Sequence, residues 1–277
     1  MSTIRDLTDL SSCREVVRVQ EDVWGRDSEV VPASVLLVSA KRGGILIGAF
    51  EEARLVGFVW SMPGTRDGAP THWSHMLAVR PEVRRRGLGQ QLKRAQRDRA
   101  IAAGVDLIEW TFDPLQAANA HLNISVLGGT SATYLVNAYG EMTGPLHRGT
   151  PTDRLVAEWW IRTPHVERRL AASGPVVRSA EILDAPVALG LAPGRDWPRP
   201  LPPRLDLDAR RILVAIPPRF TEMQASAPDA ALAWRHATRE VFTTYFGRGY
   251  RVVDFLGDKY LVESEVRSQK PAIPAAS

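Results

Sequence analysis

Cysteine is nearly absent from the sequence, since Cys13 is the single one in 277 residues. An internal disulfide is therefore excluded, and no Cys and His residues stand together at metal-ligand spacing, so we expect no metal. The chain also lacks an apolar run long enough to cross a membrane, and its first residues lack the basic and apolar pattern of a signal peptide. These absences predict a globular cytoplasmic protein without a membrane partner.

The net positive charge of the chain lies in one segment. Between Arg80 and Arg99, eight basic residues stand against two acidic ones, whereas the whole chain carries only +4. A protein that binds nucleic acid along a surface usually has several basic stretches and aromatic side chains for stacking. One compact basic segment fits a single anionic ligand better, so we do not expect nucleic acid as a partner.

The first 163 residues alternate between strand and helix patterns, which predicts a mixed α/β sheet flanked by helices. Helix signals include Ser12 followed by Glu15 as a capping box, and a stripe of apolar residues after Gly87 that Gly104 closes. Strands are expected at residues 2–7, 44–50, 54–61, 71–79, 107–112, 133–139 and 154–161, and helices at 12–24, 32–40, 88–103 and 116–127.

The rest of the chain divides into three further parts. Residues 164–209 contain eight prolines with little periodicity and are expected to form a connector. Residues 210–267 are expected to form a small α/β region with the order strand, helix, strand, strand, and residues 268–277 a frayed tail. The order of the small region repeats that of residues 107–161, which leaves an internal repeat open.

A strand that ends at Pro81 leads into Arg84, two further arginines, and then Gly87 and Gly89 at the start of a helix. Glycines at a helix start let backbone N–H groups converge on an anion, and the helix N-terminus adds partial positive charge. This pattern predicts a pyrophosphate site held by backbone and arginine side chains. The Lys-Ser/Thr of a P-loop and the third glycine of a dinucleotide fingerprint are both missing. The plain alternative is a solvated helix start.

This segment resembles the acyl-CoA signature of the GNAT acyltransferases, Gln/Arg-x-x-Gly-x-Gly/Ala, with Arg84, Gly87 and Gly89 at its fixed positions. The order of elements from residue 2 to about 162 is also similar to the GNAT fold, which is a mixed, mostly antiparallel α+β sheet. The resemblance implies acetyl-CoA or another acyl-CoA as donor. It also implies a set of cofactor-binding residues: Leu77, Ala78, Val79, Arg84, Arg85, Arg86, Gly87, Leu88, Gly89, Gln90 and Asn119.

A second stretch, residues 119–128, resembles the family's helix that ends in Leu-Gly beside the CoA. Many members carry a tyrosine four residues before that glycine, where it protonates the leaving thiolate. Ile124 occupies this position here, so the usual general acid is absent. Tyr134 and Tyr139 on the following strand are possible replacements, and Asn123 on the helix is a candidate for hydrogen bonding to the acyl carbonyl.

Attack of an amine on a thioester requires a neutral amine, so a general base is expected. Strand alternation predicts that Trp73, His75, Leu77 and Val79 share one face. The family's base often aligns with the position of Trp73, which cannot accept a proton. We therefore choose His75, because imidazole titrates near neutral pH. The alternative is a structural histidine in the core.

Further candidates lie on the strands that follow. Glu109 and Asp113 are candidates for a base or for holding the substrate's ammonium. Arg148 or Arg154 would pair with a carboxylate on the substrate or on the acyl group.

The sequence thus predicts transfer of an acetyl or larger acyl group, with succinyl as one option, to a small-molecule amine such as an amino acid. The C-terminal extension is expected to cover the acceptor site, to form a homodimer or to be a degenerate half-domain. Two rivals remain: a non-catalytic acyl-CoA sensor and a nucleic-acid-binding protein.

Overall fold

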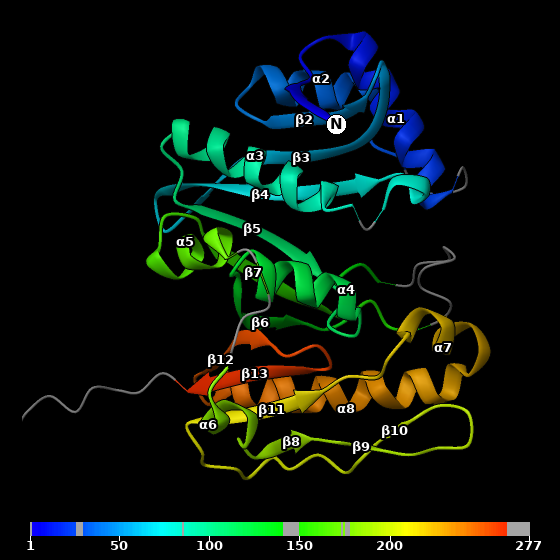
Figure 1. Ribbon diagram of the computed structural model, residues 1–277, viewed down its shortest axis with the longest axis vertical. Helices are drawn as coiled ribbons and strands as arrows, with labels where there is room; N and C mark the ends of the chain where they lie inside the picture. The colour runs from blue at the N-terminus through cyan, green and yellow to red at the C-terminus, as the bar shows by residue number, and fades with distance from the viewer. Residues whose placement is uncertain are drawn as a thin grey trace, which may run out of the picture.

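A computed structural model describes residues 2–25, 30–84, 86–140, 150–172, 174 and 178–264. Its main feature is an 11-stranded sheet with the order β1-β2-β3-β4-β5-β7-β6-β12-β13-β11-β8 (Figure 1). Two pairs of neighbours in this sheet, β4 with β5 and β11 with β8, are parallel, and the other pairs are antiparallel. The expected mixed, mostly antiparallel α/β sheet is therefore confirmed.

The elements have the following bounds. The strands of the large sheet are β1 (Thr3–Asp6), β2 (Ile45–Glu51), β3 (Arg54–Arg66), β4 (Ala69–Val79), β5 (Leu107–Phe112), β6 (Thr130–Leu135), β7 (Arg154–Trp160), β8 (Val187–Leu189), β11 (Arg211–Ala215), β12 (Tyr250–Phe255) and β13 (Lys259–Ser264). A small hairpin pairs β9 (Leu191–Ala192) with β10 (Arg199–Pro200). The helices are α1 (Leu10–Trp24), α2 (Ala33–Lys41), α3 (Leu88–Ala102), α4 (Ala117–Ala120), α5 (Pro164–Ala171), α6 (Ala180–Leu183), α7 (Phe220–Ser226) and α8 (Pro228–Gly247), with a short 3₁₀ turn η1 (Pro81–Val83) and a π-helical segment η2 (His121–Val126).

Local chemistry moves two of the expected boundaries. Helix α1 begins earlier than the capping box suggests, because the Asp9 carboxylate accepts the backbone N–H of Ser12 at 2.9 Å and acts as the N-cap. The strands expected at 54–61 and 71–79 extend toward each other, so the residues between them form the end of a long hairpin of β3 and β4. Asp67 and Gly68 form its two-residue turn, both with positive φ, which suits the twist of paired strands.

The N-terminal part of the sheet has a different layer on each face. Helices α1 and α2 cover the face that carries Phe58 and Trp60 of β3, and these side chains pack in one buried cluster with residues of α1. Helix α3 covers the opposite face, where Val59 of β3 and Leu92 of α3 belong to a second cluster (Figure 1). We call these two faces the α2 side and the α3 side.

The C-terminal strands repeat the arrangement of the N-terminal ones. The order β4-β5-β7-β6 meets its mirror image, β12-β13-β11-β8, at the β6–β12 contact. Each series has one parallel pair followed by two antiparallel pairs, and helices α7 and α8 lie between β11 and β12 as α4 and η2 lie between β5 and β6. This topology supports the internal repeat. Residues 164–209, where the sequence suggests a connector, contain α5, α6, β8 and the small hairpin, but no described helix follows β8 as α3 follows β4.

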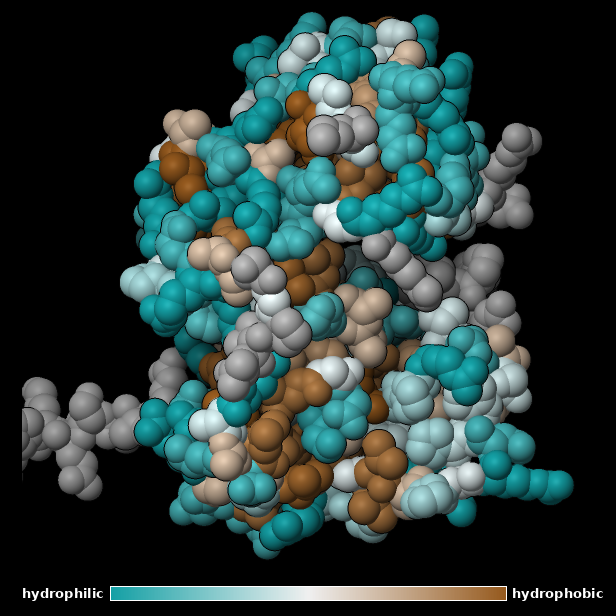
Figure 2. All heavy atoms as spheres, in the orientation of Figure 1, coloured by the Kyte–Doolittle hydropathy of each residue, from teal (hydrophilic) through white to brown (hydrophobic). Residues whose placement is uncertain are grey.

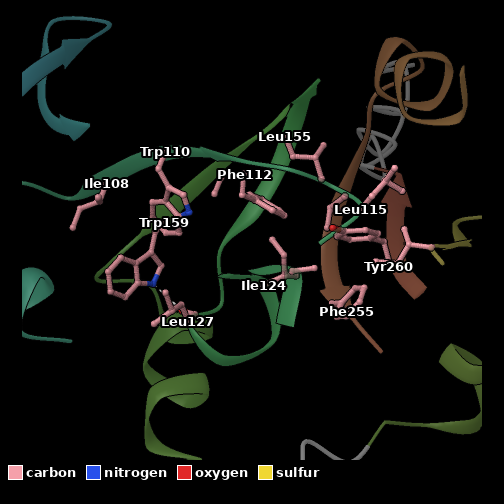
Figure 3. Packing of buried hydrophobic residues seen from close by; sticks show 14 of the residues in the cluster. Ile108, Trp110, Phe112, Leu115, Ile124, Leu127, Leu155, Trp159, Phe255 and Tyr260 are labelled. Atoms are coloured by element: carbon pink, nitrogen blue, oxygen red, sulfur yellow. Dashed lines mark hydrogen bonds between the residues drawn. The ribbon is translucent and has the colours of Figure 1, made fainter. Parts of the chain in front are cut away.

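The two series are joined more by side chains than by backbone. Strands β6 and β12 share one register pair, Val252 with Ser131. A single buried cluster, however, contains Leu115 and Ile124 from the first series together with Phe255 and Tyr260 from the second (Figure 3). The contact between the two series, which we call the joint, is therefore part of the hydrophobic core.

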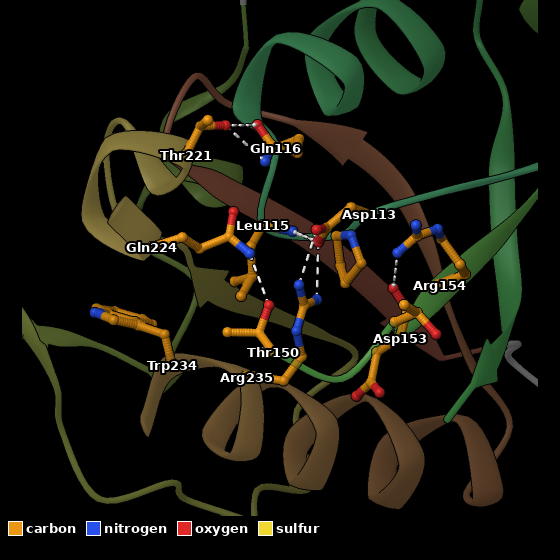
Figure 4. A network of polar contacts seen from close by, with 12 residues as sticks. Asp113, Leu115, Gln116, Thr150, Asp153, Arg154, Thr221, Gln224, Trp234 and Arg235 are labelled. Atoms are coloured by element: carbon orange, nitrogen blue, oxygen red, sulfur yellow. Dashed lines mark hydrogen bonds and ion pairs between the residues drawn. The ribbon is translucent and has the colours of Figure 1, made fainter. Parts of the chain in front are cut away.

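Buried ion pairs add to this joint. The Arg235 guanidinium of α8 donates to both carboxylate oxygens of Asp113 at 2.8 Å each (Figure 4). Arg239, one turn further along α8, makes the same two-pronged contact with Asp153. Bidentate arginine–carboxylate pairs fix geometry as well as charge, so α8 is held in one position against the ends of β5 and β7.

Replacing Arg235 with leucine should lower the free energy of unfolding by about 3–5 kcal/mol, because the half-buried Asp113 carboxylate loses its partner. The Arg235 side chain is only 1% exposed. Arg210→Leu is the matched control: it breaks a pair with Glu263 in which the arginine is 62% exposed, and it should cost less than about 1 kcal/mol. Urea unfolding measures both changes, and equal losses would show that the buried pair contributes nothing special.

Candidate active site

Strands β4 and β5 part midway along their length. Their parallel pairing covers Thr71–Trp73 of β4 and Leu107–Glu109 of β5. Beyond this point β4 stays with β3 as far as Val79, whereas β5 stays with β7 as far as Phe112. We call this point the β4–β5 parting. From here to Val79, the β5-facing edge of β4 has no strand partner.

The end of β4 leads directly into the glycine turn. Gly87 stands immediately before α3 with φ of 75°, a left-handed conformation that favours glycine. The Arg84 guanidinium donates to the Val79 carbonyl at 2.9 Å, so its charge lies beside the end of the strand. Arg85 lies outside the described residues, and the Arg86 side chain is exposed and pairs loosely with Glu51 at 3.4 Å.

Gly89, in the first turn of α3, is half-buried and has room for a Cβ. A Cβ added there would meet only the ends of the Leu122 and Leu77 side chains, both at 3.8 Å, which is ordinary contact. The first N–H groups of a helix have no acceptor within the helix, and the helix dipole places partial positive charge there. The residues present therefore fit a pyrophosphate bound at the start of α3, with Leu77 and Leu122 beside it.

A β-bulge breaks the alternation of β4. Ser61 pairs with Ser74 and Trp60 with Met76, so His75 is the extra residue without a partner on β3. The expectation that Trp73, His75, Leu77 and Val79 share one face is therefore wrong. Leu77 and Val79 pack against the α3-side cluster, whereas Trp73 pairs with Met62, which packs on the α2 side.

His75 itself lies on the α2 side. Its ring makes an edge contact with Trp60, with centroids 5.2 Å apart, and the Trp60 indole donates to Ser39 of α2. The imidazole is exposed on its outer side, while burial of the rest lowers its pKa below the usual 6.5. The imidazole is thus neutral at physiological pH and accessible from the α2 side.

Glu109 lies on this same side and is bridged by Arg66 at the tip of the β3–β4 hairpin. The Arg66 guanidinium donates to Glu109 at 2.9 Å and to Glu158 of β7 at 2.8 Å. Burial raises the pKa of the Glu109 carboxyl, against the influence of Arg66. The two carboxylates and one guanidinium of this cluster leave one negative charge, and Glu109 is the register partner of Trp73.

Asp113 and Tyr134 have structural partners instead of open surroundings. Asp113 is held by Arg235 and also accepts the backbone N–H of Leu115 at 2.9 Å (Figure 4). Tyr134 donates to Asp153 at 2.8 Å, and burial together with that carboxylate raises the phenol's pKa far above 10. Neither contact is visible in the sequence, because each depends on residues far along the chain.

Arg154 has a less complete set of partners. Its guanidinium donates to the Asp153 carbonyl at 2.9 Å and lies 5.3 Å from the centre of the Tyr139 ring. Among the described residues it forms no ion pair, and burial lowers its pKa. The Tyr139 hydroxyl bonds to Thr111 of β5 at 2.6 Å. Arg148 lies outside the described residues.

The helix after β5 holds the two asparagines. Asn119 is exposed on α4, and Asn123 is 5% exposed within the π-helical segment, where its carbonyl accepts the N–H of Gly129. Ile124 is fully buried and points into the core beside Phe255 and Leu115 (Figure 3). The position of the family's tyrosine thus belongs to the joint with the C-terminal strands.

Lys93 is a buried residue that sequence reasoning missed. It lies on α3 with 2% exposure, donates to Ser74 at 2.8 Å and to Gln96 at 3.1 Å, and lies over the Trp110 ring at 3.7 Å. Burial lowers the pKa of its amine to about 7. The sequence did indicate that Lys93 lies near the buried face of α3, because it directly follows Leu92 and stands one turn after Gly89. A lysine at such a position usually extends its ammonium to solvent, so its burial was not predicted.

No helix in the described part of the chain is long and apolar enough to cross a membrane. The described residues also contain no group of three or more His, Cys, Asp or Glu side chains placed to hold a metal ion.

Residues 11–122 match the family model described as Acetyltransferase (GNAT) family. This segment covers the β4–β5 parting and the glycine turn at Gly87–Gly89, which we call the glycine cradle. Residues 11–122 therefore form a GNAT acetyltransferase domain, and acetyl-CoA is the donor that such domains use. No curated protein sequence matches the chain.

Several solved structures are similar in part. The ribosomal-protein-S18-alanine N-acetyltransferase from Escherichia coli is 17% identical, with a TM-score of 0.48 over 64% of this chain and 100% of that one. A Streptococcus pneumoniae acetyltransferase of the GNAT family is 15% identical, with 0.47 over 57% and 98%. A Salmonella typhimurium protein solved with its cofactor acetyl-CoA is 17% identical, with 0.47 over 64% and 99%.

Gly89→Trp should abolish CoA binding while the protein stays folded, because an indole at this open position fills the space over the helix start. Gly247→Trp at the end of α8 is the matched control, since a Cβ there meets nothing within 4 Å. Calorimetric titration with CoA measures both. If the Gly89 variant bound CoA as tightly as the unmodified protein, the assigned cradle would be wrong.

Proposed function

We propose that the protein transfers an acyl group from acyl-CoA to the amine of a small molecule, by direct attack of the amine on the thioester. The observation that carries this proposal is the continuity of the β4–β5 parting with the glycine cradle. A donor bound by its pyrophosphate at Gly87–Gly89 would extend along the unpaired edge of β4 toward Ser74 and His75. The thioester would then lie where the strands separate.

The charges on the α2 side suit an amine acceptor. His75 is neutral and exposed there, so it is placed to accept the proton that the amine loses on attack. The remaining negative charge of Arg66, Glu109 and Glu158 favours an ammonium group nearby before it is deprotonated. In this proposal His75 is the base, and Glu109 holds the acceptor.

Arg154 gives a reason to prefer a substrate with a carboxylate. Its guanidinium is partly buried on the α2 side, beside Thr111 and Tyr139, and lacks a carboxylate partner among the described residues. A carboxylate on the acceptor, as in an amino acid, or on the acyl group, as in succinyl, would supply that partner. Asp113 and Tyr134 have no role at the substrate in this proposal.

The second candidate, a sensor that binds acyl-CoA without turnover, is favoured by one observation. Ile124 fills the family's tyrosine position and is committed to the core. Thiol release from acetyl-CoA and succinyl-CoA, with a pooled library of amines, separates the two functions. Stabilisation by CoA without thiol release would support the sensor.

His75→Ala should lower turnover by about 10²-fold, because it removes the proton acceptor. The lowered pKa of His75 also gives a pH dependence: the imidazole is neutral above its pKa, so activity should fall only below about pH 6.5. The variant should lack this acidic limb. His165→Ala, at a histidine of α5, is the control, and a loss of less than about threefold in the His75 variant would reduce that residue to a structural role.

Arg154→Met should raise KM for carboxylate-bearing substrates by about tenfold or more, since a charge-assisted hydrogen bond is lost. Neutral analogues of the same substrates, such as amino acid amides, should be unaffected. Steady-state kinetics with matched acid and amide acceptors measures the difference. An equal change for acid and amide would mean that Arg154 only supports the fold.

A further inference from the structure

Lys93 contacts both strands at the point where they separate. Ser74 is the first residue of β4 beyond its pairing with β5, and Trp110 is the first residue of β5 beyond it. The Lys93 ammonium donates to the Ser74 hydroxyl at 2.8 Å and lies 3.7 Å from the centre of the Trp110 ring. The amine is therefore fixed at the β4–β5 parting, on the α3 side.

This lysine is part of a buried polar network. Gln96 exchanges hydrogen bonds with Ser74 and accepts one from Lys93 at 3.1 Å. On β3, Ser61 pairs in register with Ser74, and its hydroxyl bonds to the His72 ring at 2.9 Å. Each of the five residues is at most 6% exposed.

The network contains no carboxylate. The partners of the Lys93 ammonium are a hydroxyl, an amide oxygen and an aromatic face, and burial is the cause of its lowered pKa, with no charged side chain of the described residues contributing. His72 is the other titratable member, and burial lowers its pKa too. A lysine buried without a counter-ion is costly for the fold. This energetic cost indicates that the buried Lys93 amine has a functional role at this position.

The tyrosine hydroxyls all have hydrogen-bond partners elsewhere in the protein. All five are described, and each hydroxyl is engaged elsewhere: Tyr134 with Asp153, Tyr139 with Thr111, Tyr245 with Arg204, Tyr250 with Ala209 and Tyr260 with Pro114. In this proposal the acid near the thioester is therefore a residue of another type.

We propose that Lys93, acting through the Ser74 hydroxyl, supplies the proton to the sulfur that leaves the acyl group. This inference rests on the proposed acyl transfer and deepens it. Lys93 is a positioning and proton-supplying residue behind Ser74, which is the group that would face the sulfur.

The protons balance over one cycle. The acceptor nitrogen forms a bond to the acyl carbon, and the bond from that carbon to sulfur breaks, leaving a thiolate. Ser74 donates its proton to the thiolate and takes one from the Lys93 ammonium, which becomes a neutral amine. The proton lost by the acceptor nitrogen goes to His75 on the opposite side of the sheet, and both groups then exchange with water.

Lys93→Met tests this directly, because methionine has a similar length and suits a buried site over an aromatic ring. Thiol release is measured with acetyl-CoA and a pooled library of L-amino acids from pH 6 to 10. We expect turnover to fall about 10-fold or more with CoA affinity unchanged within about twofold. In the unmodified protein turnover should decline at alkaline pH as the lysine loses its proton, and the variant should lack this decline. Lys41→Met, at an exposed lysine of α2, is the control.

Ser74→Ala supplies a second, smaller change. If the lysine acts through the hydroxyl, the Ser74→Ala and Lys93→Met variants and their combination should lose similar activity, because groups that act as one unit are not additive. Losses that multiply in the combination would overturn the relay.

The outcomes distinguish a failure of the proposed acyl transfer from a failure of the role proposed for Lys93. An unmodified protein that releases no thiol with any acceptor contradicts the acyl transfer itself. An active unmodified protein, with Lys93→Met retaining turnover within about threefold and the same alkaline decline, contradicts only the role of Lys93. Because removing a buried charge relieves its desolvation, the methionine variant should also melt at a higher temperature, which verifies that any loss of turnover is not a loss of folding.

Discussion

The parallel pairing between β4 and β5 stops after three residues, and the candidate site depends on where it stops. Strand β4 continues with β3 and β5 with β7, so each keeps one neighbour while the edge between them is left unpaired. An unpaired strand edge offers N–H and C=O groups to another extended chain. The pantetheine of an acyl donor is such a chain, and the cradle at Gly87 and Gly89 begins where β4 ends. In the proposed function, the position of the pairing determines where the donor binds and where its thioester lies.

Around this point the two faces of the sheet have different chemistry. The α2 side carries His75, Glu109 and Arg154, which are accessible or partly buried and suited to a charged acceptor. The α3 side carries a fully enclosed network around Lys93. A thioester lying between the strands would meet an amine from one side and proton donors from the other, so attack and departure would not compete for the same groups.

Local sequence features were enough to predict the family, the glycine turn before α3 and the order of elements up to Trp160. A glycine turn after a strand is a local pattern, and the helix and strand periods are local too. The bulge at His75 was not predictable, because it depends on which β3 residue faces it. The partners of Asp113 and Tyr134 lie on α8 or beyond the turn that follows β6, so these side chains looked available in the sequence. Lys93 was passed over for a related reason: only the packing of Ser74, Gln96 and Trp110 around it reveals that it is buried.

The repeated strand series has a consequence for assembly. In a protein with only the first series, β6 would be an edge strand, open to pairing with the same edge of a second molecule. Here β12 of the same chain occupies that edge and α8 anchors it through two arginines. At this edge β12 of the same chain therefore takes the place that a strand of a second molecule would occupy. In the described part of the chain, only the first series has a helix and a glycine turn after its parallel strand, so this internal pseudo-dimer would hold one donor molecule instead of two.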